Sequence, residues 1–131
     1  MNRTDDANAE LPASVKIKEV GPRDGLQAES AVLHTKDKLS LIDALAATGL
    51  REIETTSFVS PKAIPALADA SEVFDNLYCR SETAYSAIVP NEKGAQRAVE
   101  AKPDKIQVFL AATESYNRSN VQMSGPTTAI L

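Results

Sequence analysis

Segments in which every second residue is hydrophobic alternate along this chain with segments in which every third or fourth residue is hydrophobic. The first spacing predicts strands at residues 15–20, 51–59, 85–90 and 104–112, and the second predicts helices at residues 35–49, 60–77 and 91–101. Strand and helix therefore alternate, and a polar, irregular stretch follows the fourth strand, with a fourth helix missing or barely begun. Such alternation is typical of a parallel sheet with right-handed crossovers.

The ends of the three helices carry recognisable signals. Thr35 is placed to cap the first helix, and Gly49 to take the left-handed conformation that closes it. Ser60 and Pro61 suit the cap and first turn of the second helix, and Asn91 suits the cap of the third. These signals fix the expected boundaries between strands and helices.

Three expectations concern buried side chains. Val15 and Ile17 should face inward from the first strand, and Val99 should face inward from the third helix. The fourth strand, DKIQVFLAA, is a nearly continuous apolar run, which is typical of a strand buried on both faces. Two architectures fit this pattern, an open doubly wound sheet and part of an eight-stranded (β/α)8 barrel, which needs about 250 residues when complete.

Composition narrows the class of protein. The chain has 131 residues, 43% of them hydrophobic and 24% charged, with a net charge of −4, as in a soluble globular domain. Basic residues are scattered among acids, so we expect no nucleic-acid partner, and no apolar run is long enough to predict a membrane span. Residues 1–13 are polar and predict a flexible tail without a targeting signal. Cys79 is the single cysteine, so no internal disulfide forms, and we expect a cytoplasmic protein.

Unusual polar residues gather where the strands end, and the carboxyl ends of parallel strands are where chemistry collects in such folds. They are Arg23, Asp24 and Gln27 after the first strand, Glu54 to Ser57 at the end of the second, Asn91 after the third, and Thr113, Glu114 and Asn117 after the fourth.

Each of these positions also has a purely structural interpretation. The segment GPRDG, residues 21–25, contains two turn-forming dipeptides and on its own predicts a turn. Glu54 inside an apolar strand fits equally a salt bridge or an exposed edge. Neither glycine-rich nucleotide-binding pattern is present, which disfavours the nucleotide-binding version of the open sheet.

Four segments together resemble one known family. VKIKEVGPRDGLQAE, REIETTSFVSPKAIPALADASEVF, VPNEKGAQRAV and FLAATESYNRSNVQMS are similar to the N-terminal part of the 3-hydroxy-3-methylglutaryl-CoA (HMG-CoA) lyases, over residues 14–124. That family belongs to the metal-dependent TIM barrels that make or break carbon–carbon bonds. The resemblance implies an α/β fold in which this chain is the N-terminal half, about four β/α units, of a (β/α)8 barrel.

The resemblance also implies roles for five residues. Asp24 would be a ligand of a divalent cation, Mg²⁺ or Mn²⁺, and Arg23 would stabilise the enolate that develops on an acyl-CoA substrate. Glu54 would hold Arg23 in place, and Gln27 and Ser57 would lie next to the substrate. The implied reaction cleaves HMG-CoA to acetyl-CoA and acetoacetate.

The resemblance has limits. Family members are longer and carry a His-x-His pair and a catalytic cysteine that have no match here, and Cys79 does not inherit that role. Residues 125–131 depart from the family pattern, which suggests truncation or a frameshift. We therefore expect little lyase activity from this chain alone, and self-association through open sheet edges. Two alternatives remain, an acyltransferase of the same superfamily and a non-catalytic half-barrel that pairs with another chain or with itself.

Overall fold

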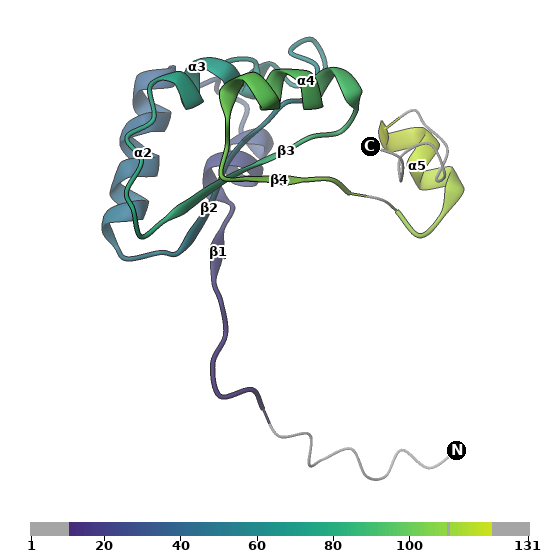
Figure 1. The fold of residues 1–131 in the computed structure, drawn as a ribbon. Helices are drawn as coiled ribbons and strands as arrows, with labels where there is room; N and C mark the ends of the chain where they lie inside the picture. Colours follow the sequence, from purple (N-terminus) through teal and green to yellow (C-terminus); the bar gives the residue numbers. More distant parts are fainter. Residues whose placement is uncertain (1–10, 110, 122–131) are drawn as a thin grey trace, which may run out of the picture.

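The structure, a computed structural model, describes residues 11–109 and 111–121 (Figure 1). Four short strands form one sheet: β1 (Lys18–Glu19), β2 (Glu52–Ser57), β3 (Ala84–Ile88) and β4 (Lys105–Gln107). The helices are α1 (Leu26–Ala28), α2 (Thr35–Ala47), α3 (Ala70–Asp75), α4 (Glu92–Ala101) and α5 (Glu114–Val121). A π-helical turn spans Gly21–Gly25, and a 3-10 turn spans Pro65–Leu67. Most of the predicted tail at residues 1–13, and all of residues 125–131, lie outside the described residues.

The sheet has the order β1-β2-β3-β4, and every neighbouring pair is parallel. Strands that are consecutive in sequence are therefore neighbours in space. This is the order around a (β/α)8 barrel, whereas the strand order of a doubly wound sheet reverses partway through the sheet. The predicted α/β class and the four parallel strands are confirmed. The open doubly wound alternative is wrong.

The sheet is curved rather than flat. Lys18 on β1 donates a hydrogen bond from Nζ to Oε1 of Gln107 on β4, although β2 and β3 lie between these strands. Flat neighbouring strands are about 4.8 Å apart, so two edge side chains three strands apart meet only over a concave surface. The inner face of the sheet is thus a trough like the inside of a barrel wall.

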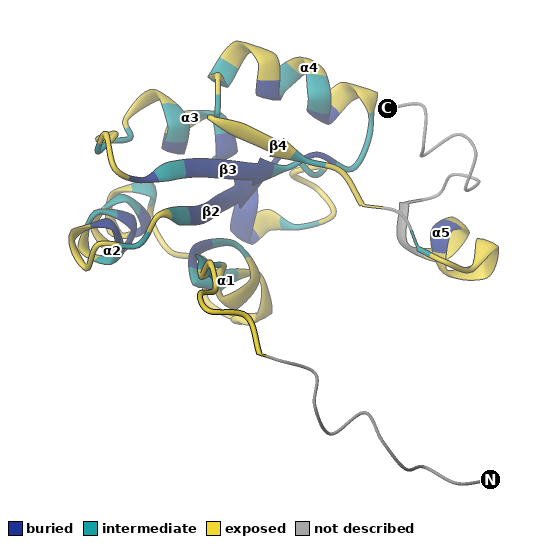
Figure 2. Ribbon diagram, turned by 60° about the horizontal axis from the view of Figure 1, so that its bottom comes forward, coloured by how far each residue is buried: buried dark blue, intermediate teal, exposed yellow. Residues whose placement is uncertain are grey.

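Helices α2, α3 and α4 cover the convex face of the sheet (Figures 1 and 2). Two clusters of buried residues lie between them and the sheet. They are Ile42, Ala46, Ile53, Val73 and Tyr85, and Phe58, Ala70, Ala87, Val89 and Ala98. Burial of this apolar surface is the main favourable term that holds the helices on the sheet.

The edge strands are more exposed than predicted. The side chains of Val15 and Ile17 were expected to face inward, but these residues are 75% and 65% exposed. Ile106 and Val108 of the fourth predicted strand are also exposed, so its burial on both faces is wrong. The reason is topological: β1 and β4 are the edge strands, and each pairs with a neighbouring strand on one side only.

The helix boundaries follow the predictions in part. Asn91 caps α4 by accepting a hydrogen bond from Gly94 N at 2.9 Å, and Gly49 has the left-handed φ of 88°, so both predictions are confirmed. Thr35 is not a cap; its hydroxyl donates to Asp69 Oδ2 at 2.8 Å.

Three further predictions about the helices are wrong. The second helix does not begin at Ser60–Pro61, because Pro65 interrupts it and α3 begins only at Ala70. Val99 is 68% exposed on the outer face of α4. A fourth helix, α5, follows β4 where the pattern predicted little or none.

Candidate active site at the carboxyl ends of the strands

The segment GPRDG is both a turn and part of a polar cluster. Val20 O accepts hydrogen bonds from Arg23 N at 3.1 Å and from Asp24 N at 2.7 Å, and Leu26 N donates to Gly21 O five residues earlier, which makes a π-helical turn soon after β1. Single π-helical turns are rare and often occur at functional sites. Pro22 is buried beneath the turn, and the turn projects the side chain of Arg23 toward β2.

Arg23 lies between two carboxylates. Its Nε donates to Glu54 Oε1 at 2.5 Å, and its Nη1 donates to Asp24 Oδ1 at 2.7 Å. The side chain of Glu54 is 4% exposed, that of Arg23 is 17% exposed and that of Asp24 is 64% exposed. A carboxylate as buried as Glu54 requires a charged or hydrogen-bonding partner. The predicted neighbourhood of Arg23, Asp24 and Glu54 is therefore present.

The second oxygen of Glu54 also has a partner, which the sequence did not indicate. Gln107 on β4 donates from Nε2 to Glu54 Oε2 at 2.5 Å, and Lys18 Nζ lies 3.8 Å from the same oxygen. Lys18 and Gln107 are separated from Glu54 by 36 and 53 residues. Only the pairing of the strands brings them together.

A bulge in β2 places Ser57 on the same face as Glu54. Glu54 pairs with Ser86, but Thr56 pairs with Ala87, so Thr55 is an extra residue opposite β3. Side chains alternate along a strand, and positions three apart would otherwise face opposite sides. The bulge removes that difference, and Ser57 faces the cavity.

A cavity of about 490 Å³ opens beside this cluster. Arg23, Gln27 and Ser57 line it, together with the apolar residues Val59, Ala63, Ile64, Ile88, Pro90, Phe109 and the phenol Tyr116. Three of the five predicted site residues thus share one cavity of a size that suits a small-molecule ligand. Glu54 supports Arg23 from beneath the cavity.

Two other polar residues at this edge, Asn91 and Asn117, have structural roles. Asn91 is committed to the cap of α4. Asn117 is buried and bonds to the backbone of Ala111, accepting from its N at 2.8 Å and donating to its O at 3.1 Å. Neither residue lines the cavity.

Asp24 is the candidate metal ligand. Its carboxylate is a hard oxygen donor of the kind that Mg²⁺ and Mn²⁺ prefer, and it is exposed to solvent next to Arg23, although Asp24 does not itself line the cavity. Among the residues that the structure describes, however, no three histidine, cysteine or acidic side chains gather as a metal site. Both oxygens of Glu54 are occupied by Arg23 and Gln107. The donor set fits a hard cation as one ligand of several.

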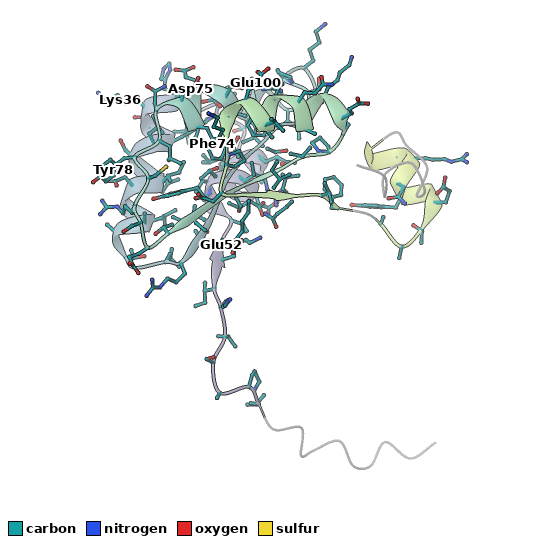
Figure 3. The ribbon with its side chains drawn as sticks, viewed as in Figure 1. Lys36, Glu52, Phe74, Asp75, Tyr78 and Glu100 are labelled. Atoms are coloured by element: carbon teal, nitrogen blue, oxygen red, sulfur yellow. The ribbon has the colours of Figure 1, made fainter. Side chains whose placement is uncertain are left out.

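The inner face also holds a second acidic residue, Glu52, on the side of the sheet away from α3 and α4 (Figure 3). Lys105 Nζ lies 2.5 Å from Glu52 Oε2, and Lys18 Nζ lies 3.1 Å from Oε1. The hydrogen bond from Lys105, with a smaller contribution from Lys18, lowers the pKa of Glu52 below its ordinary value of 4.5, although burial opposes the shift.

A cavity of about 520 Å³ at the opposite end of the strands does not have the same character. Arg80 and Cys79 line it, but Arg80 Nη2 is paired with Asp43 Oδ1 at 2.6 Å. Burial and the nearby Asp104 raise the pKa of the Cys79 thiol, which disfavours the reactive thiolate. The interpretation of Cys79 as a non-catalytic residue fits this environment.

No helix within the described part of the chain is long and apolar enough to cross a membrane.

The sequence profile of the HMGL-like family matches residues 14–129. The chain is 47% identical over 113 residues to the hydroxymethylglutaryl-CoA lyase of Bacillus subtilis. The matched region covers 86% of this chain and 38% of that protein. It is 46% identical over 114 residues to the mitochondrial hydroxymethylglutaryl-CoA lyase of Rattus norvegicus. This match covers 87% of this chain and 35% of that protein. The chain therefore spans little more than a third of the length of these relatives.

Solved structures agree with the sequence comparison. An HMG-CoA lyase from Acinetobacter baumannii, in complex with coenzyme A and 3-methylmalate, superimposes with a TM-score of 0.85 at 41% identity, over 88% of this chain and 38% of that one. The HMG-CoA lyase of Bacillus subtilis superimposes with a TM-score of 0.84 at 45% identity, over 89% of this chain and 39% of that one. The four strands correspond to the N-terminal part of these barrels.

Proposed function

Because the chain belongs to the HMGL-like family, we propose that its cavity at the carboxyl ends of the strands is part of an HMG-CoA lyase active site. The observation that carries the proposal is the placement of Arg23. Its guanidinium is held by Glu54 and Asp24 at the wall of a cavity that Gln27 and Ser57 also line. The implied ligand is an acyl-CoA.

The proposed reaction breaks one carbon–carbon bond of HMG-CoA. A base takes the proton of the tertiary hydroxyl, and none of the residues named above supplies this base. The carbon that carries the hydroxyl becomes the ketone carbon of acetoacetate. The electron pair of the broken bond moves to the thioester fragment as an enolate, which then takes up a proton to give acetyl-CoA. Negative charge therefore develops on the thioester oxygen during bond cleavage.

Arg23 is suited to that developing charge. A guanidinium has five N–H donors, and Arg23 uses one on Glu54 and one on Asp24. The remaining donors are available to a ligand in the cavity. Because Glu54 and Asp24 already fix the guanidinium, little reorganisation is needed when the enolate forms. In this proposal Glu54 is a positioning residue, and Gln27 and Ser57 contact the substrate.

A bound Mg²⁺ or Mn²⁺ would supply Lewis acidity that makes the tertiary hydroxyl easier to deprotonate. Asp24 would be one of its ligands, and the others would come from groups outside the described residues. We accordingly expect weak Mn²⁺ binding by this 131-residue polypeptide, measured by titration calorimetry and lost in Asp24→Ala. The control is Asp75→Ala, which removes an exposed carboxylate from α3. Equal binding by wild type and Asp24→Ala would refute the role of Asp24.

Titration calorimetry with HMG-CoA tests the role of Arg23. Removing its charge in Arg23→Met should weaken binding at least about tenfold, since a hydrogen bond to a charged group contributes about 1.5–3 kcal/mol. Arg51→Met is the matched control, because Arg51 is an exposed arginine at the opposite end of β2. Equal affinity of wild type and Arg23→Met would overturn the proposal. We expect little or no turnover by this polypeptide alone.

The two alternatives are less well supported. An acyltransferase of the same superfamily is disfavoured because the relatives named above are lyases. A non-catalytic half-barrel is favoured by one observation, the exposed apolar residues Ile17, Ile106 and Val108 at and next to the two edge strands. A stable oligomer that binds neither HMG-CoA nor Mn²⁺ would support that alternative. A cytoplasmic location stays a proposal, since relatives include both mitochondrial and cytoplasmic enzymes.

A further inference from the structure

We propose that Lys18 and Gln107 are positioning residues that keep Glu54 paired with Arg23. This inference rests on the proposed function only for the role of Arg23 in binding the substrate. The pairing of Glu54 with Arg23 is observed in the structure. The chain of contacts runs from Lys18 on β1 to Gln107 on β4, from there to Glu54 on β2, and finally to Arg23 after β1. It crosses the inner face of the trough.

The amide of Gln107 has an acceptor oxygen and a donor nitrogen, so its two ends are not equivalent in this series of hydrogen bonds. A lysine ammonium can only donate hydrogen bonds, so the contact with Lys18 requires the oxygen of the Gln107 amide to face it. The amide nitrogen must then face the other way, toward Glu54 Oε2 at 2.5 Å. Lys18 therefore selects the amide orientation that offers an N–H donor to Glu54. With the opposite orientation, two oxygens would face each other.

Gln107 also separates two charges. Lys18 Nζ lies 3.8 Å from Glu54 Oε2, which is outside hydrogen-bond distance, while Gln107 occupies that oxygen. If Gln107 were removed, the ammonium of Lys18 would be the donor closest to Oε2 of Glu54, while Arg23 remains on Oε1. A direct Lys18–Glu54 pair would draw the carboxylate toward β1 and loosen its contact with the guanidinium. Because the Gln107 amide is neutral, Arg23 remains the cation that pairs most closely with the Glu54 carboxylate.

A second contact steadies Lys18. Its Nζ lies 3.1 Å from Glu52 Oε1, and the other oxygen of Glu52 is 2.5 Å from Lys105. Lys18 thus has a carboxylate partner of its own and can offer a further N–H to Gln107. A merely structural interpretation, in which the chain of contacts only ties β1 to β4, predicts an effect on stability and none on Arg23.

Side-chain NMR of ¹⁵N-arginine-labelled protein distinguishes these interpretations. The Nε–H signal of Arg23, assigned by its loss in Arg23→Met, should shift and exchange faster with solvent in Gln107→Leu and in Lys18→Met. Lys18→Arg keeps a donor for Gln107 and should restore the wild-type signal. Lys105→Met is the control, because it removes a lysine from Glu52 without touching Glu54.

Binding gives a second readout. HMG-CoA affinity, measured by calorimetry, should fall about tenfold in Gln107→Leu, the loss expected when one hydrogen bond from the guanidinium of Arg23 to the ligand is weakened. An unmoved Arg23 signal in both Gln107→Leu and Lys18→Met would overturn the inference, whatever the wild type binds. Failure of the wild type to bind HMG-CoA would instead refute the proposed function. If Gln107→Leu does not fold, Lys18→Met and Lys18→Arg decide the matter.

Discussion

The charged residues on the inner face of the sheet act as pairs that cross from strand to strand. Glu52 on β2 is held from both sides, by Lys18 on β1 and by Lys105 on β4. Because the trough is concave, side chains of non-neighbouring strands meet and share one carboxylate. The stability contributed by such a carboxylate must depend on pH.

The direction of that dependence follows from the lowered pKa of Glu52. A carboxylate whose pKa is lower in the folded state stabilises the fold fully above its unfolded pKa of about 4.5, and this contribution is lost as pH falls through the folded pKa. Lys105→Met removes the largest cause of the shift. It should reduce the free energy of unfolding at pH 7 by about 0.5 kcal/mol, a value usual for a partly exposed pair.

Urea denaturation between neutral and acidic pH checks this expectation. The difference between wild type and Lys105→Met should shrink as Glu52 becomes protonated. Lys36→Met is the control, since Lys36 lies on α2, away from Glu52 (Figure 3). A difference that stays constant down to acidic pH would show that the ion pair is not its source.

Single residues were predicted from the sequence where a local motif carried them. Arg23 and Asp24 stand in one segment, and their neighbourhood with Glu54 followed from the rule that strand ends converge. Lys18 and Gln107 were missed because both lie within predicted strands, whereas the search for a site considered the residues at the strand ends. Their contact depends on how strongly the sheet curves, and curvature has no signature in the hydrophobic pattern of a single strand.

At the scale of elements, the loop after β2 and the start of α4 are fitted closely together. Gly94 lies in the first turn of α4, and a Cβ at this position would lie 2.6 Å from the carbonyl oxygen of Phe58. Arg97 of the same helix lies over the ring of Phe58, with its guanidinium carbon 5.4 Å from the ring centre. The absence of a side chain at Gly94 therefore permits the approach of α4.

Gly94→Ala should destabilise the protein by about 1–3 kcal/mol, the usual cost of overfilling a packed contact, because the backbone at Phe58 would have to move. Urea denaturation at a fixed protein concentration measures this change. Gly25→Ala is the matched control: Gly25 has helical φ and ψ, and no atom lies within 4 Å of an added Cβ. Equal effects at Gly94 and Gly25 would contradict the packing argument.

The elements themselves were largely predictable, and the errors have physical causes. Alternating spacing gave the four parallel strands, and Asn91 and Gly49 gave helix ends, because caps are local hydrogen bonds. The second helix was placed too early because Pro65 interrupts a pattern that remains apolar at helical spacing. The bulge at Thr55 was invisible, since one extra residue does not change the apolar content of a strand.

At the scale of the whole molecule, the sheet has two open edges and a curvature that a partner strand would continue. Ile17 next to β1, and Ile106 and Val108 at and after β4, are exposed at these edges. Exposed apolar edge strands are templates for pairing with another chain. The likeness to barrels more than twice as long gives the same interpretation of these surfaces.

We accordingly expect the 131-residue polypeptide to self-associate through its edges. Light scattering coupled to size-exclusion chromatography should give a mass above 14.0 kDa that falls on dilution. Ile17→Lys and Val108→Lys should shift the equilibrium toward monomer, because a charge on an edge opposes pairing. Val99→Lys, at an equally exposed position on α4, should leave it unchanged. A monomer at every concentration would refute the expectation.

The extra residue in β2 explains how Glu54 and Ser57, three positions apart in sequence, lie on one face of the sheet. Deleting Thr55 would leave a regular ladder in which Glu54 still pairs with Ser86 and Ser57 with Ile88, so Ser57 would still face the cavity. Straightening the strand with Thr55 kept would turn Ser57 to the helix-covered side. A graft of the ETTS segment onto another parallel sheet would need to carry this one-residue offset with it. The offset, rather than the identity of the serine, aims its hydroxyl.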